Sequence, residues 1–250
     1  MMRFASPAFV VVLCFTALSS SASAQEAAAK AKVEELLKQS AKEFLATISD
    51  VNEEQWKFRG NGIRHSIGDE AEHVAFAEQE LQRVILNALK AAADPKRAAE
   101  LKGKEAKIRA LMIDAEKGAE NYQPRGRLRS KLEVLEYFPT AHNKLLQLLA
   151  GSQELSTHIY KHPNKDYGEL TALQWFYYVA YHKQRHVNQI KAIKAHPDYP
   201  GRVRTAWSDP RAGQSGPRVS WAMVGHNRQA APQRASLGLF IARNSPGAPE

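Results

Sequence analysis

Residues 173–190 read LQWFYYVAYHKQRHVNQI, and this stretch decides the fold class. Its apolar residues recur at intervals of three and four, which is the period of an α-helix. At about 100° per residue, one side of that helix carries Trp175, Val179, His182, His186 and Ile190. The two histidines therefore interrupt an apolar stripe, and the sequence predicts a helix with two imidazoles on its buried face.

Helical spacing extends outward from this stretch through most of the chain. Ser66 is a good N-cap residue, and Ser130 with Glu133 forms a capping-box pattern. Four long helices are expected at residues 26–51, 67–92, 130–151 and 170–196, with a shorter one between 99 and 118. No stretch alternates with a period of two, so no sheet is expected. The sequence predicts an all-α fold, a four-helix bundle with a short extra helix.

The first 24 residues are predicted to be a secretory signal peptide. Arg3 gives a short positive start, residues 8–18 form an apolar run, and Ala22-Ser23-Ala24 fits a cleavage site. A run of this length is too short to span a bilayer, and no later segment is apolar enough. The mature chain would begin near Gln25, in the periplasm or outside the cell. It would lack Cys14, the one cysteine, which excludes zinc–thiolate and iron–sulfur sites.

The formal net charge of +9 is unevenly placed. Residues 201–250 hold seven Arg against two acidic residues, and they are rich in Pro and Gly. This segment is predicted to be a disordered tail, because it cannot bury enough apolar surface to offset its ordering entropy. Residues 25–200, the predicted bundle domain, hold 27 basic against 24 acidic residues. Nucleic-acid binding is therefore not expected of the bundle.

A third imidazole could join the pair from the second helix. His73 lies at the edge of the apolar stripe of that helix. Three imidazoles in a bundle core would bind a first-row divalent ion and leave coordination positions for water or substrate. The alternative is that each histidine is a hydrogen-bonded core residue without an ion. A di-iron centre is not expected, because Glu70-x-x-His73 has no second Glu-x-x-His partner before His182 or His186.

Two segments together resemble a known family. SIGDEAEH at residues 66–73 and the stretch at 173–190 are similar to the DinB-like superfamily of metal-binding four-helix bundles, over roughly residues 28–198. The resemblance implies a divalent metal, zinc or nickel, bound by one histidine of the second helix and two of the fourth. Matched residue by residue, these are His73, His182 and His186. Some relatives are thiol-dependent transferases or isomerases, and the fold does not imply DNA binding.

Two functions remain open from the sequence. The first is a metal-dependent transferase or hydrolase acting on a small-molecule substrate of unknown identity. The second is a non-catalytic metal-binding or stress-related periplasmic protein, in which the ion is structural or sequestered. They differ in whether the ion keeps an exchangeable water. A basic-tailed adhesion or nucleic-acid-binding protein is a weaker third reading, and a homodimer is left open.

Overall fold

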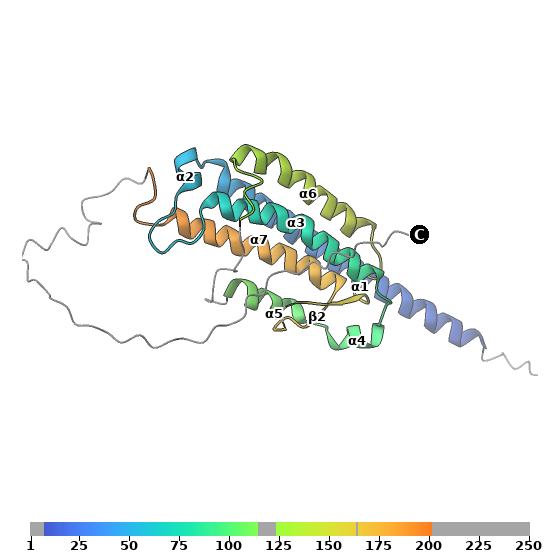
Figure 1. Cartoon of the computed structure of the whole chain (residues 1–250). Coiled ribbons are helices and arrows are strands. Elements are labelled where there is room, and N and C mark those ends of the chain that lie inside the picture. Colours follow the sequence, from blue (N-terminus) through green and yellow to red (C-terminus); the bar gives the residue numbers. More distant parts are fainter. Residues whose placement is uncertain (1–7, 115–123, 164, 202–250) are drawn as a thin grey trace, which may run out of the picture.

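The computed structural model describes residues 8–114, 124–163 and 165–201. Its body consists of four long helices, α1 (Ala8–Ser49), α3 (Ile67–Lys90), α6 (Lys131–Gly151) and α7 (Ala172–Lys194). Both α1 and α3 pack against α6 and α7, so the four helices close into a bundle (Figure 1). The predicted four-helix bundle is confirmed.

Polar side chains at the helix starts explain why three of these helices begin where they do. Ser66, Ser130 and Thr171 each accept a hydrogen bond from the backbone N–H three residues later, and the side chain at that position returns one. These capping boxes satisfy backbone donors that the first helical turn leaves open. The starts predicted after Ser66 and Ser130 are confirmed.

The N-terminal helix begins earlier than the expected Glu26. In the structure α1 starts at Ala8 and continues without a break to Ser49. The residues around the predicted cleavage site are alanine-rich, and alanine has the highest helix propensity. Whether residues 1–24 are removed stays a prediction. The predicted disordered tail lies outside the described residues from 202 onward. Within the described part of the chain, no helix combines the length and apolarity needed to cross a membrane.

Short helices connect the long ones. The expected polar loop at 52–65 contains α2 (Glu53–Lys57), capped by Asn52. The single short helix expected between 99 and 118 is instead α4 (Pro95–Glu100), α5 (Lys104–Arg109) and a π-helical turn, η1 (Ala110–Asp114). Pro95 starts α4, because the first helical residue needs no N–H donor. Both α5 and η1 pack against α7.

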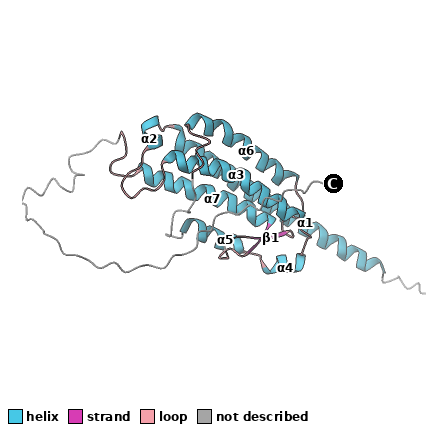
Figure 2. Cartoon of the chain, in the orientation of Figure 1, coloured by secondary structure: helices cyan, strands magenta, loops and turns pink. Residues whose placement is uncertain are grey.

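The expectation of no sheet is wrong. Strands β1 (Ile159–Lys161) and β2 (Glu169–Thr171) form an antiparallel pair, with Tyr160 opposite Leu170. The pair lies beside the bundle, and β2 leads directly into α7 (Figure 2). Each strand has only three residues, which is too short for a period of two to stand out in the sequence.

The buried core consists of two apolar clusters separated along the bundle by polar side chains. On α7, apolar residues up to Ala180 belong to one cluster, and those from Val187 onward belong to the other. Along each of the four long helices, the buried apolar residues pass from one cluster to the other at about the same level of the bundle axis. The buried polar residues found there are Ser40, Glu78, His142, His182, Lys183 and His186. Buried polar groups require hydrogen-bond partners, so apolar packing alone does not explain why these residues are buried in this layer.

Candidate metal centre

Three imidazoles meet in the polar layer. His73 comes from α3, and His182 and His186, one helical turn apart, come from α7. The Nε2 atom of His182 lies 3.2 Å from Nε2 of His73 and 3.2 Å from Nε2 of His186. Ligand atoms of all three lie within 4.8 Å of one another. The structure thus brings together the three residues that the sequence singled out.

The two separations of 3.2 Å suit a shared divalent ion. Zinc binds histidine nitrogen at about 2.0–2.1 Å, so two nitrogens on one tetrahedral ion lie about 3.3 Å apart. Hydrogen bonding accounts for the cluster less well. An imidazole Nε2 either donates or accepts, so a single proton on His182 could serve only one of its two neighbours at a time. A cation at the centre would satisfy three lone pairs at once.

The carboxylate of Glu70 fixes the orientation of one imidazole. Its Oε2 atom lies 2.6 Å from Nδ1 of His186, and its Oε1 atom lies 3.5 Å from Nδ1 of His65. A carboxylate accepts hydrogen bonds, so Nδ1 of His186 carries the proton and its Nε2 presents a lone pair toward the cluster. This is the usual arrangement of a carboxylate behind a metal-binding histidine.

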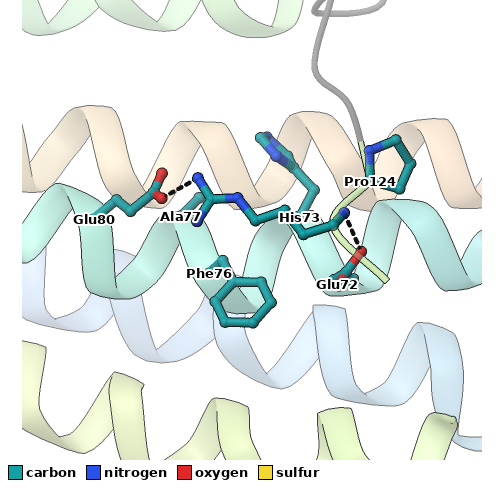
Figure 3. A pocket seen from close by; sticks show the side chains of 7 residues that line it. Glu72, His73, Phe76, Ala77, Glu80 and Pro124 are labelled. Atoms are coloured by element: carbon teal, nitrogen blue, oxygen red, sulfur yellow. Dashed lines mark hydrogen bonds and ion pairs between the residues drawn. The ribbon is translucent and has the colours of Figure 1, made fainter. Parts of the chain in front are cut away.

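Burial differs among the three histidines. His186 is 0% exposed and His182 is 4% exposed, whereas His73 is only partly buried. His73 also lines a small hollow with a volume of about 30 Å³, together with Phe76, Glu80, Arg125 and others (Figure 3). A volume of this size holds one or two water molecules. The cluster is therefore enclosed on the α7 side and meets a hollow on the His73 side.

The loop directly before α6 forms one wall of that hollow, and the side chain of Glu72 holds this loop in place. The buried Glu72 carboxylate accepts hydrogen bonds from four successive backbone N–H groups, those of residues 125–128, at 2.5–3.2 Å. Arg125 also pairs with Glu80 on α3, and its guanidinium lies 5.7 Å from the ring centre of Phe76. The loop is thus tied to the same helix that carries His73.

A second polar cluster lies in the same layer. The Lys183 ammonium contacts both oxygens of Glu78, at 2.8 and 3.0 Å, and Nδ1 of His142 lies 2.6 Å from Glu78 Oε1. Burial alone would raise the pKa of Glu78, but Lys183 and His142 hold that pKa below its usual range. Burial lowers the pKa of Lys183, and Glu78 opposes this shift. The lowered pKa favours the ionised form of the Glu78 carboxylate, which contacts two buried basic side chains, Lys183 and His142.

Sequence reasoning missed the supporting carboxylates. Glu70 lies three residues before His73, and as a site residue it was considered only as part of a di-iron element. Glu72, Glu78 and Lys183 were not singled out as site residues at all. One signal was present: Glu70, His73 and Ala77 follow helical spacing, so Glu70 shares the inward side of α3.

The fold and the site together define a four-helix bundle whose core brings three imidazoles from two helices into positions that could hold a metal ion. The family model described as DinB superfamily matches residues 36–190. The chain belongs to the DinB superfamily, and the resemblance seen in its sequence is confirmed. No curated protein and no solved structure matches the chain significantly.

Proposed function

We propose that this chain binds one divalent metal ion, zinc or nickel, through Nε2 of His73, His182 and His186. The convergence of the three Nε2 atoms, with Glu70 behind His186, carries this proposal. Three protein ligands leave at least one coordination position, which is typical of catalytic rather than structural zinc sites. We assign the protein to metal-dependent transfer or hydrolysis of a small-molecule substrate.

Each residue of the centre has a separable task. Glu70 holds the Nδ1 proton of His186, so the opposite nitrogen stays available as a ligand. The burial of His182 and His186 keeps bulk water from the α7 side of the centre. His73 faces the hollow from which a substrate can approach. A divalent ion held there supplies Lewis acidity and lowers the pKa of a bound water or thiol.

Metal content tests the proposal directly. Wild type, His182→Ala and the control His158→Gln are purified, dialysed and analysed by elemental mass spectrometry. His158 is partly buried but bonds the Ala91 carbonyl, away from the cluster. We expect about one ion per chain in wild type and control, and less than about a tenth of that in His182→Ala. Equal metal in all three proteins, or none in any, would contradict the proposal.

A non-catalytic role is the second candidate, and the small volume of the hollow favours it. An ion that is closed off by protein ligands would be structural or sequestered. X-ray absorption at the zinc edge separates the two candidates by counting ligands. Three nitrogens and an oxygen that added bromide displaces support the catalytic role, because bromide replaces a bound water and not a protein ligand. Four protein ligands support the structural role.

We further propose that the protein is exported to the periplasm or the cell exterior. The motivation is the positive start, apolar run and small-residue site within residues 1–24. Expression of the full chain in a bacterium, followed by cell fractionation and intact-mass analysis, tests this proposal. The expected product begins at Gln25 and is found outside the cytoplasm. A full-length chain that stays in the cytoplasm would contradict export.

A further inference from the structure

The hollow beside His73 has a distinct chemical character. Its charged lining residues are Glu72, Glu80 and Arg125, and Phe76 contributes an apolar wall. Four backbone N–H groups already saturate the Glu72 carboxylate. Glu80 is engaged by Arg125. The guanidinium of Arg125 is therefore the cationic group of this lining, and its carboxylate partner is Glu80.

The pairing of Arg125 with Glu80 is exchangeable. The Arg125 side chain is 47% exposed and the Glu80 side chain is 21% exposed, so water reaches the guanidinium and weakens its attraction to Glu80. The ring of Phe76 lies beneath the guanidinium and supports it without using its hydrogen-bond donors. Guanidinium groups bind carboxylates through two parallel hydrogen bonds. Arg125 is thus oriented and able to pair with an anion other than Glu80.

The metal proposed for the centre adds a second attraction for anions. Neutral imidazoles leave the full charge of a divalent ion uncompensated, and the nearby Glu70 offsets only part of it. His73 and Arg125 both line the hollow, so an anion held there would lie beside one of the proposed metal ligands and beside the guanidinium. The volume of about 30 Å³ accommodates a small group and not the body of a large molecule.

We propose that the hollow between His73 and Arg125 binds a carboxylate-sized anionic group, recognised by Arg125 and by the metal together. This inference rests on the metal-binding function proposed above and names the ligand class for the same site. Arg125 is a recognition residue, and Glu80 is its internal competitor. Glu72 is a positioning residue, because its four hydrogen bonds hold the backbone from which Arg125 projects.

The test uses the cobalt(II)-loaded full chain and formate as the probe. Formate binding is followed by the change in the cobalt visible spectrum at constant ionic strength. Arg125→Gln should weaken formate binding about tenfold, the loss of one charge-assisted interaction. Glu80→Gln should tighten formate binding, because it removes the competitor. The backbone N–H of residue 125 and its bond to Glu72 remain in Arg125→Gln.

Arg127→Gln is the matched control. The Arg127 guanidinium lies 6.0 Å from the Phe76 ring centre, a distance similar to the 5.7 Å of Arg125. Arg127 does not, however, line the hollow. It should bind formate as wild type does, which separates direct contact from a general loss of positive charge. Equal weakening in both arginine variants would overturn the assignment of Arg125.

The outcomes also separate this inference from the proposed function. Failure of wild type to bind zinc, nickel or cobalt would overturn both. Cobalt binding with unchanged affinity in every variant, but equal formate affinity in wild type and Arg125→Gln, would overturn only the anion site. Cobalt binding with formate affinity lowered in Arg125→Gln and raised in Glu80→Gln supports it.

Discussion

Replacing Glu78 by Gln should destabilise the bundle strongly. The change keeps the shape of the side chain and removes its charge, while Lys183 stays in a site where it is 1% exposed. If Lys183 gave up its proton at about pH 7.5, about three units below its usual pKa, the cost would be about 4 kcal/mol. Removing one partner of a buried ion pair costs about 3–5 kcal/mol. We expect the free energy of unfolding to fall by about 3–4 kcal/mol.

Equilibrium urea unfolding, followed by circular dichroism, measures this change. The double variant Glu78→Gln/Lys183→Met removes both charges and should recover most of the loss, because no uncompensated charge stays buried. Glu34→Gln, which breaks a solvent-exposed pair with Lys38, is the surface control and should leave the unfolding midpoint unchanged. A loss below about 1 kcal/mol in Glu78→Gln would refute the reasoning, since it would mean that water reaches Lys183 in the folded state.

Three further predictions concern packing, the metal and pH. Gly68→Ala should lower stability by about 1–3 kcal/mol in thermal melts, because the new Cβ would lie 2.5 Å from Nε1 of Trp56; Gly151→Ala, with open space around it, should not. Glu70→Gln should weaken metal binding about 10–100-fold in a competition titration with a chromophoric chelator. Glu78 has a lowered pKa in the folded state, so its stabilisation is present above its usual pKa of 4.5 and is lost as pH falls below that value. Urea melts on both sides of that pH should therefore show the advantage of wild type over Glu78→Gln shrinking in acid.

The long helices could be predicted because local side chains determine where they begin. Ser66 and Ser130 bond backbone groups three residues away, so their effect is readable without knowledge of the fold. The β1–β2 pair could not be read in the same way. Its pairing joins Ile159 to Thr171 across a connection of several residues, and three-residue strands carry too little pattern. Short-range patterns therefore revealed the helices and not the hairpin.

The candidate site was predictable only in its innermost part. His182 and His186 interrupt an apolar stripe, and that interruption is visible in the sequence. Glu78 and Lys183 gave no such signal, because α3 and α7 are each packed against more than one neighbour. On such helices a charged residue can point into the core from a side that a single stripe does not reveal. Which charges are buried is decided by how the helices are rotated against each other.

The buried pair of Lys183 and Glu78 bears on whether the metal ion must be present when the protein folds. Lys183 directly follows His182 on α7, and Glu78 lies on α3, the helix of His73. Sliding α7 along α3 by one turn, about 5.4 Å, would separate the ion pair and scatter the imidazoles in one step. The axial register of the two helices is thus locked by a contact that contains no metal. The protein would then fold before it binds the metal ion, unlike a zinc finger, which folds only when it binds its ion.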